Sequence, residues 1–475
     1  MKRQLLFFVI VMILCGTAWG QTLGHEDDDD DWYHWRDYMP GMGHRGRVNL
    51  NVVPRLSTGA RNSAGLFRSY TDNFIDPRFY CRDIDTFFFV GANIPYENRH
   101  VNAGFARSFN SLYLALYYGG GFVRGYRERR GEDTAEYLPN EMERETSWKN
   151  NLALLLGFGE AMGIRLDVAV HSETIRMARR GSMGGPGVTE DNLTQIRFNY
   201  GPSFALTWGA RFGSLAPWAR VGYRVPNLHL SDYETSQHGT RISNYSRLRT
   251  GGAMEISGGA RFELGEVSSI GGEIWLGNTF PDRLDRSHSS PGSVPPNYNV
   301  TDRRGGMTGF GLGVYSMHLF GFGFDDVKLG FSPNLNFGIT SISNSWEGDT
   351  GSFRTFGDRF TTLDMGVDLG INWQVTQRIA LFAGAKLRAF DWTTWAQTGE
   401  KHYRFEGGEE NLEARLSKWV LEGVRMEGPA IGVTFSPMED VVIGLAMNSF
   451  IDGLFGNGQS MPTFDFTVSA RIDRW

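Results

Sequence analysis

The feature that most constrains the fold is the alternation in "TQIRFNYGPSFALTWGARF", residues 194–212. Every even-numbered position from 196 to 212 is apolar, aromatic or small, and most odd-numbered positions are polar or small. A period of two is typical of a β-strand, because successive side chains point to opposite faces. Strands in globular proteins usually run to about 5–6 residues. The stretch therefore predicts an unusually long strand whose even-numbered face is apolar throughout.

Similar alternation recurs along the chain, with short connections that alternate with long polar ones. The expected strands cover 84–93, 100–108, 111–120, 150–159, 162–171, 194–212, 214–225, 252–264, 268–278, 307–320, 326–340, 361–375, 378–390, 417–436, 439–450 and 463–475. Tight turns are expected near 160, at 213–214, near 266, near 324, at 376–377 and at 436–438. The long polar connections are 121–149, 173–193, 226–250, 278–306, 341–360, 391–416 and 451–462.

This arrangement is typical of a membrane barrel rather than of a soluble domain. Compact soluble domains rarely carry so many long loops, whereas outer-membrane barrels combine short periplasmic turns with long outer loops. In lipid every backbone polar group must be satisfied internally, which a closed barrel achieves. We therefore predict an all-β chain: a transmembrane antiparallel up-and-down β-barrel of 14–16 strands, with the even face of 194–212 against lipid. A soluble sandwich or propeller is the alternative, but no blade repeat of about 40–50 residues is evident.

The first 20 residues form a separate unit. Lys2 and Arg3 precede the apolar run "LLFFVIVMIL", and small residues follow at Ala18 and Gly20. This pattern predicts a secretory signal peptide, 1–20, that is cleaved after Gly20. The expected divisions are thus a signal peptide (1–20), an N-terminal acidic or plug-like segment (21–82) and the barrel (83–475). Cys81 would then be the single mature cysteine, which excludes an intramolecular disulfide.

The chemistry-bearing motifs are few. The net charge of −6, without a dominant basic patch, excludes a nucleic-acid partner. No Gly-x-Ser-x-Gly, HExxH or phosphate-binding loop is present. His171 and Ser172 are adjacent, but neighbouring strand residues face opposite sides and would not form a dyad. We expect no enzymatic activity and no cofactor.

The acidic segment "GHEDDDDDWYHWRDYMPGMGH" (24–44) is the one candidate for metal binding. His25, His34 and His44, with the methionines and aspartates around them, are residue types that bind divalent metals. Their spacing fits no fixed template, and blocks of like charge are usually solvated and disordered. We favour a solvated acidic segment with no metal.

The charged positions on the polar faces of the expected strands are candidates for the lumen. They are Arg165, Asp167, Arg197, Glu255, Arg261, Glu263, Glu273, Asp364, Asp368, Lys386, Arg388 and Glu422. Their signs are mixed, whereas a charge-selective filter needs a ring of one sign or a hydrophobic constriction. We favour a ladder of structural ion pairs across the strands over a selectivity filter.

The chain resembles the outer-membrane β-barrel proteins of diderm bacteria in its signal peptide, its alternation of turns and loops, and its final strand "FDFTVSARIDRW". Such proteins end on an aromatic residue that the barrel-assembly machinery recognises, and Trp475 matches this feature. The resemblance implies location in the cell outer membrane, in contact with its lipid. Within this class, the pre-barrel segment and "TGARNSAGLF" (58–67) resemble the plug of the long-chain fatty-acid transporter family.

The expected function is a channel for passive uptake of small polar or hydrophobic solutes, because a barrel of this size encloses more room than an eight-stranded one. If residues 21–82 fill the lumen, hydrophobic solutes are favoured, and if they hang free, polar ones are. The alternative is a structural or adhesive surface protein in which the long loops are functional. The sequence leaves a monomer and a trimer open.

Overall fold

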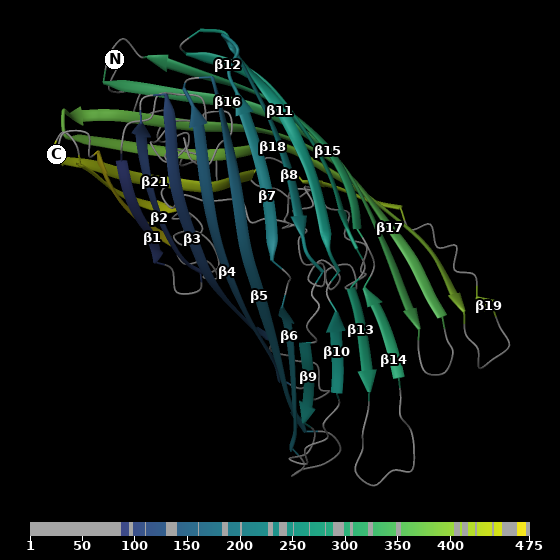
Figure 1. Ribbon diagram of the computed structural model, residues 1–475. Coiled ribbons are helices and arrows are strands. Elements are labelled where there is room, and N and C mark those ends of the chain that lie inside the picture. Colours follow the sequence, from purple (N-terminus) through teal and green to yellow (C-terminus); the bar gives the residue numbers. More distant parts are fainter. Residues whose placement is uncertain are drawn as a thin grey trace.

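The computed structural model describes residues 87–94, 98–109, 111–129, 140–159, 161–182, 189–199, 202–226, 231–236, 245–249, 251–265, 267–280, 282–287, 299–304, 307–321, 326–347, 353–402, 409–410, 417–422, 425–438, 441–448 and 463–471. All its strands belong to a single 23-stranded sheet (Figure 1). Within these ranges, no helix has the length and apolarity needed to cross a membrane.

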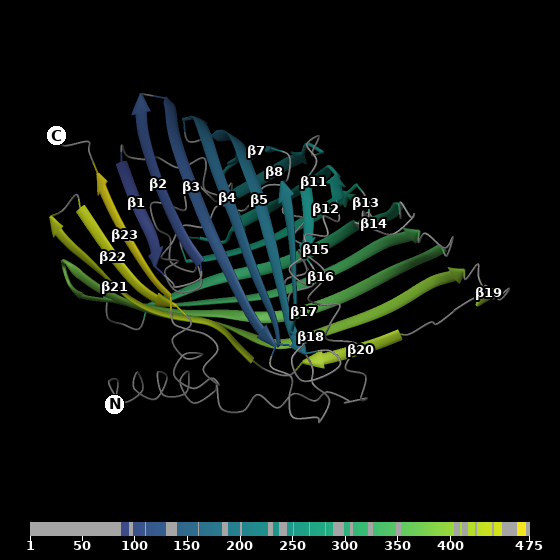
Figure 2. The ribbon, with the colours of Figure 1, turned by 90° about the horizontal axis from the view of Figure 1, so that it is seen from below.

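Sixteen of the described strands form a closed antiparallel ring. In order they are β1 (Phe87–Ile94), β2 (Asn98–Phe109), β3 (Leu112–Arg129), β4 (Asn140–Phe158), β5 (Met162–Ser182), β7 (Ser203–Ala210), β8 (Leu215–Arg224), β11 (Ala253–Glu263), β12 (Ser268–Thr279), β15 (Met307–Gly321), β16 (Val327–Glu347), β17 (Phe353–Thr376), β18 (Ile379–His402), β21 (Arg425–Met438), β22 (Val441–Asn448) and β23 (Thr463–Arg471). Each pairs with the next in this order, and β23 pairs with β1, where Phe87 lies opposite Arg471 (Figure 2). The predicted transmembrane antiparallel barrel is confirmed, and each predicted span overlaps a ring strand.

The two faces of the ring are inverted relative to a soluble protein. On β5, Arg165 and Asp167 are buried on the inner face, whereas Leu166 is 45% exposed on the outer face. The same alternation holds on β7, where Leu206 is 53% exposed between buried Ala205 and Thr207. Burial of polar groups with exposure of large apolar ones is costly in water and favourable in lipid. The outer surface of the ring is therefore a lipid-facing surface.

Short turns close one end of the ring, here called the short-turn end. Gly159 and Gly213 lie in two of these turns with φ of 59° and 62°, a conformation that glycine adopts without steric cost. In the turn after β17, the Thr376 hydroxyl accepts hydrogen bonds from the backbone N–H groups of Arg378 and Ile379. The turn predicted at 436–438 lies instead within β21, which ends at Met438, and β22 begins at Val441.

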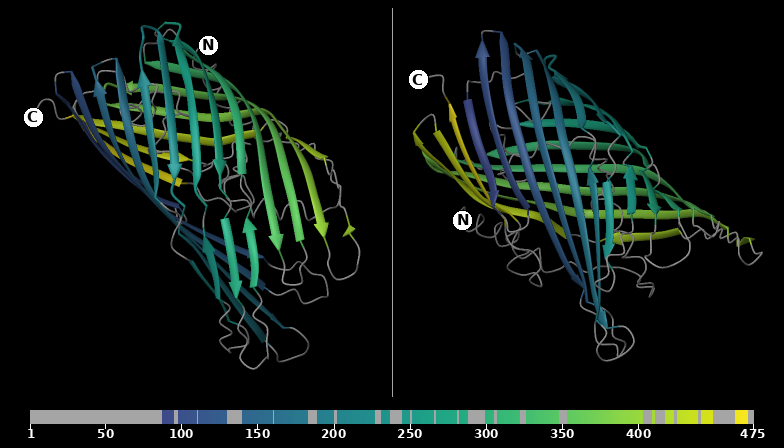
Figure 3. Two further views of the ribbon diagram at one scale, coloured as in Figure 1. Left: turned by 45° about the vertical axis from the view of Figure 1, so that its right-hand side comes forward. Right: turned by 60° about the horizontal axis from the view of Figure 1, so that its bottom comes forward.

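At the other end the sheet continues into a second tier, here called the extension (Figures 1 and 3). It consists of the outer parts of β3, β4, β5, β16, β17 and β18 together with β6 (Thr189–Asn199), β9 (Ser231–Ser236), β10 (Tyr245–Arg249), β13 (Asp282–Ser287), β14 (Asn299–Arg304), β19 (Glu409–Glu410) and β20 (Ser417–Glu422). Much of what the sequence analysis assigned to loops is therefore strand. Because both faces of these strands are rich in polar residues, they lack the apolar alternation that identifies a strand on one buried or lipid-facing side.

Five neighbouring ring strands stop in one row where the extension begins. Their terminal residues are direct cross-strand partners in the order Ser203, Arg224, Ala253, Thr279 and Met307. We call this row the break line, and the part of the ring between it and the short-turn end the membrane band. The left panel of Figure 3 shows the strands of the extension separated from those of the band at this level.

Proline and glycine explain the position of the break line. The segments that separate the two tiers are 200–202, 225–230, 250–252, 280–281 and 305–306. Each contains such residues: Pro202 with Gly201, Pro226, Gly251 with Gly252, Pro281, and Gly305 with Gly306. Proline cannot donate to the ladder, and glycine weakens a strand interior. Two backbone hydrogen bonds still connect neighbouring segments at the break line. The Val225 N–H donates to the Pro202 carbonyl at 3.0 Å, and the Phe280 N–H donates to the Gly252 carbonyl at 2.8 Å.

The break line also corrects the reading of 194–212 as one strand. Ala169 of β5 lies opposite Ser203 of β7, but Ser172 lies opposite Asn199 of β6, one residue out of step. A one-residue shift moves every side chain of a strand to the other face. Residues 204–208 keep the predicted phase, with Phe204 and Leu206 exposed outside. Ile196 and Phe198 belong to β6, where they lie opposite Ile175 and Glu173 in the shifted register.

Candidate transport path inside the barrel

Aromatic rings on the inner wall lie over glycines of the neighbouring strand. A Cβ atom on Gly309 would lie 2.8 Å from the Trp275 ring, and one on Gly157 would lie 3.1 Å from the Tyr113 ring. In the same way Phe89 covers Gly104, Tyr315 covers Gly271 and Phe382 covers Gly432, each glycine being the direct cross-strand partner of the ring. The rings therefore pack along the wall, where each takes the space of the missing side chain.

An apolar cluster lines the inner face of β1–β4. It consists of Phe89, Ala106, Tyr113, Ala115, Tyr117, Ala153 and Leu155, all buried. The Phe89 and Tyr117 ring centroids are 5.9 Å apart, a separation at which aromatic pairs attract each other. This sector of the path is apolar and aromatic.

A buried ion pair lies at the edge of that cluster. Arg165 Nε donates to Asp167 Oδ2 at 2.9 Å, and the two side chains are 3% and 0% exposed. Arg165 is opposite Leu155, and Asp167 is opposite Ala153. Because the partners are two residues apart on one strand, alternation alone places them on one face. Their charges are neutralised locally.

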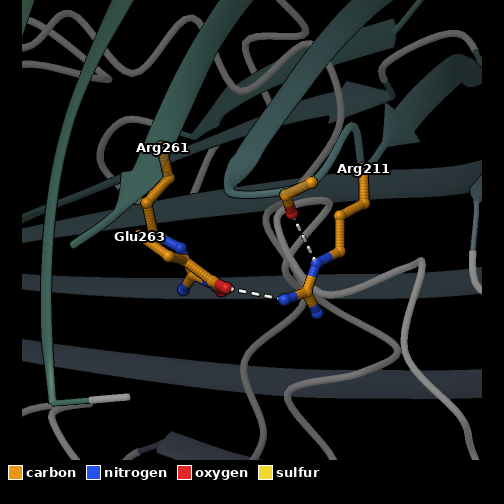
Figure 4. Close-up of polar contacts among 4 residues, drawn as sticks. Arg211, Arg261 and Glu263 are labelled. Atoms are coloured by element: carbon orange, nitrogen blue, oxygen red, sulfur yellow. Dashed lines mark hydrogen bonds and ion pairs between the residues drawn. The ribbon is translucent and has the colours of Figure 1, made fainter. Parts of the chain in front are cut away.

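A second charge cluster lies near the short-turn end (Figure 4). Glu263 accepts hydrogen bonds from Arg261, at 2.5 Å, and from Arg211, at 2.8 Å. Arg211 also donates from Nε to the Gly213 carbonyl at 3.1 Å. Arg211 was not among the predicted lumen residues, although it occupies an odd, polar position of 194–212. Its contact joins the end of β7 to β11, past the intervening β8.

The opposite sector of the inner wall is acidic and amide-rich. Asn336 donates to Asp364 Oδ2 at 3.4 Å. Backbone register continues this row from Asp364 to Asp391 and on to Glu422. Asp368 lies opposite Lys386 in the next part of β17, and Arg388 is opposite Gly366. The row therefore combines three acidic positions with two basic positions nearby on β18.

The remaining predicted positions are distributed differently. Glu255 and Glu273 are half-buried on the inner face, and Glu273 lies between Gly259 and Gly313 in register. Arg197, predicted to face the lumen, lies opposite Thr174 in backbone register, and its side chain lies outside the described ones.

The acidic segment that carries His25, His34 and His44 lies outside the described residues. Within the described part of the chain, no group of three or more His, Cys, Asp or Glu residues is placed to hold a metal ion. His171 and Ser172 lie opposite Lys149 and Trp148, on alternate faces of β5.

The fold is that of outer-membrane β-barrels. Similar solved structures include a Pseudomonas aeruginosa FadL homologue (TM-score 0.39, 10% identity, 88% of this chain and 99% of that one). The Ralstonia pickettii toluene transporter TbuX (TM-score 0.36, 9% identity, 89% and 100%) and the CymD monoaromatic hydrocarbon channel (TM-score 0.34, 8% identity, 85% and 93%) are also similar. No family model and no curated protein matches the sequence. At these identities the likeness concerns the fold alone.

Proposed function

We propose that the protein is a passive channel of the cell outer membrane that admits small solutes, with apolar and aromatic ones favoured over polar ones. The supporting observation is the inner wall, where rings cover the glycines of neighbouring strands and join an apolar cluster on β1–β4. Rings held along a wall offer apolar contact area without projecting across the path. The ion pairs Arg165–Asp167 and Arg261–Glu263 neutralise part of the inner charge, which argues against a strong charge filter.

The N-terminal residues enter this proposal in two ways. Residues 1–20 direct export as a cleaved signal peptide, and the barrel-assembly machinery inserts the mature chain into the outer membrane. Residues 21–82 act as a plug that restricts the path. A plugged, ring-lined barrel favours hydrophobic solutes, whereas a barrel with this segment hanging free favours polar ones.

Planar-bilayer conductance tests the channel and the plug together. We expect small or intermittent conductance for the full-length mature protein and a larger, steady conductance after deletion of 21–82. Liposomes that carry the full-length protein should take up a small aromatic solute faster than a sugar of similar mass. Equal and negligible conductance in both proteins would reject the channel and favour a structural or adhesive surface role, for which the extension would be the functional part.

Epitope tags test the orientation. The ring has an even number of strands, so the start of β1 and the end of β23 lie at the same end, the short-turn end. We assign this end to the periplasm. A tag near Ser290 or near Gly408 should react with antibody on intact cells. A tag at Gln377, in a short turn, should react only after the outer membrane is permeabilised. The reverse pattern would invert the topology.

A further inference from the structure

Three polar side chains contact one another on the lipid-facing surface near the short-turn end. His318 of β15 approaches the hydroxyl oxygen of Ser268 through Nδ1, at 3.1 Å, and that of Ser316 through Nε2, at 3.2 Å. In the sheet, His318 lies opposite Ser268 of β12 on one side and Phe331 of β16 on the other. Phe331 is exposed on the outer side, and direct partners share a face. We call His318, Ser268 and Ser316 the outer polar group.

The side chains around the outer polar group are apolar and face lipid. Ile270, Val314 and Phe320 are all exposed. Each is an even number of residues from Ser268 or from His318 on the same strand, so it shares their face. The Phe320 ring also stacks on the His318 ring, with the two centroids 6.3 Å apart. Polar groups within such a surface are costly unless they have partners, so this group calls for a functional explanation.

The ladder between β15 and β16 has a gap beside the outer polar group. Pairing of β15 with β16 stops after Tyr315 and resumes at His318 in the same register. The residue that faces Ser316 in that register is Pro333, which has no N–H to donate. Between these two described strands the gap is therefore explained by one missing hydrogen bond, without a slip of the strands.

A neighbouring hydrogen bond identifies the atom that loses its donor. The Leu319 N–H donates to the Val267 carbonyl at 2.7 Å, so the odd-numbered residues of β15 turn their backbone groups toward β12. The even-numbered residues, which include Ser316, therefore turn theirs toward β16. The carbonyl oxygen of Ser316 thus points at Pro333 and lacks its donor in the ladder.

The outer polar group presents donors and acceptors together. In a neutral imidazole one ring nitrogen donates and the other accepts, so His318 donates to one serine oxygen and accepts from the other serine hydroxyl. The serine that accepts from His318 keeps its own proton for an outside acceptor. The other serine oxygen and the Ser316 carbonyl are acceptors for outside N–H or O–H groups.

We propose that the outer polar group and the Ser316 carbonyl bind a phospholipid whose headgroup carries a primary ammonium, such as phosphatidylethanolamine. The surface faces lipid, so the missing donor has to come from the lipid side. His318 lies three residues from Gly321, the end of β15, and so lies near the edge of the hydrocarbon. An ammonium supplies three N–H donors for the carbonyl and serine oxygens, and the adjacent phosphate accepts from a serine hydroxyl.

The test compares phosphatidylethanolamine with phosphatidylcholine of identical acyl chains. The two lipids differ only in that methyl groups replace the N–H donors of the headgroup in phosphatidylcholine. Native mass spectrometry of the full-length mature protein, released from a nonionic detergent, measures the binding of each lipid. We expect phosphatidylethanolamine to bind roughly tenfold more tightly, which corresponds to one hydrogen bond to a charged group. Equal affinities would mean that water supplies the donor and would overturn the proposal.

Two variants remove the site by different routes. His318→Phe removes the imidazole, and Pro333→Val supplies the N–H that the Ser316 carbonyl lacks. Each should lose most of the preference for phosphatidylethanolamine, and either one carries the test if the other does not fold. Thr308→Val is the matched control, because it removes a contact with Asn278 on the outer face of the same two strands, β15 and β12, at their other end. Loss of the preference in this control, or its survival in both site variants, would overturn the assignment.

A third lipid and a conductance measurement complete the test. Phosphatidylglycerol has hydroxyl donors on an anionic headgroup, and we expect it to bind more weakly than phosphatidylethanolamine. Tighter binding of phosphatidylglycerol would assign the site to an anion and overturn the role of the ammonium. Bilayer conductance of His318→Phe should equal that of wild type, because the site lies on the outside of the wall. A lipid preference in a protein without conductance would reject the channel and retain the lipid site.

Discussion

Strands β5 and β7 are hydrogen-bonded neighbours, yet only β5 continues from the membrane band into the extension. β5 runs over Met162–Ser182, whereas β7 covers Ser203–Ala210 and its extension counterpart β6 is shifted by one residue. The same contrast separates the continuous strands β16–β18 from the interrupted strands β8, β11, β12 and β15. Among the described side chains, exposed apolar residues reach up to the break line, as Phe204, Tyr223 and Met254 show. A continuous strand must therefore keep one alternation of inward and outward residues through both the membrane band and the extension. An interrupted strand can use a different alternation in each.

The largest expected effect comes from one charged residue placed on each side of this boundary. Leu166 is 45% exposed on the outer face of β5 in the band, and Ala178 lies on the same strand in the extension, an even number of residues away. Leu166→Arg should destabilise the protein by about 2–4 kcal/mol, the cost of arginine near the bilayer midplane. Ala178→Arg should cost close to nothing, because that level is solvated. Urea unfolding of protein refolded into liposomes measures both, and equal effects would mean that the boundary is misplaced on β5.

The next effect tests whether the interrupted part of the band is as tightly packed as a continuous wall. A Cβ on Gly259 of β11 would overlap the Gly272 carbonyl oxygen and lie 3.0 Å from both Glu273 Cα and Trp218 Nε1. Gly259→Ala should therefore cost about 1–3 kcal/mol, since backbone atoms must move. Gly321→Ala is the matched control, because no atom lies within 4 Å of its added Cβ. The temperature at the midpoint of the heat-modifiable gel shift reports the difference between the two variants. An unchanged midpoint for Gly259→Ala would show that the backbone of this sector accommodates the added methyl group at little cost.

A smaller effect is expected at the charge cluster of Figure 4, which ties the end of β7 to β11. Glu263→Gln removes the negative charge shared by Arg211 and buried Arg261, and we expect a loss of about 1–2 kcal/mol. Arg211→Gln should cost under about 1 kcal/mol, because its side chain is 35% exposed and solvent screens the pair. A double-mutant cycle on liposome-embedded protein measures the coupling. Strictly additive effects would show that the cluster does not connect the two strands.

The smallest effect addresses the break line itself. Backbone amides near it, such as that of Val225, should exchange with deuterium faster than that of Leu166 in β5, which has ladder partners on both sides. Pro226→Val restores a backbone N–H and should slow exchange nearby, with a gain in stability of no more than about 1 kcal/mol. Equal exchange in wild type at Val225 and Leu166 would contradict the contrast between continuous and interrupted strands.

The two tiers also differ in how far the sequence predicts them. All ring strands were predicted, since lipid on one side forces outer residues such as Leu206 and Ile274 to be apolar. Most extension strands were assigned to loops, because solvent on both sides leaves no such constraint. The exceptions are β6, reached by the predicted strand 194–212, and β20, covered by 417–436. The shift at Pro202 was hidden, because Ile196 and Phe198 are apolar and continue the even-numbered alternation in the sequence. Local pairs such as Arg165–Asp167 follow from strand alternation, but the Arg211–Glu263 contact depends on how the turn after β7 closes, which alternation does not encode.

The break line has a consequence for how such a protein can change over generations. The register of the band strands in this sector is set by their own partners, from Ser203 to Met307, and not by what lies beyond them. Insertions, deletions or wholesale replacement of β6, β9, β10, β13 and β14 can therefore accumulate without turning a lipid-facing residue inward. The five segments that separate the two tiers are therefore natural positions at which to join foreign sequences to the barrel. Strands β3–β5 and β16–β18 offer no such freedom, because a single added residue there would propagate into the membrane.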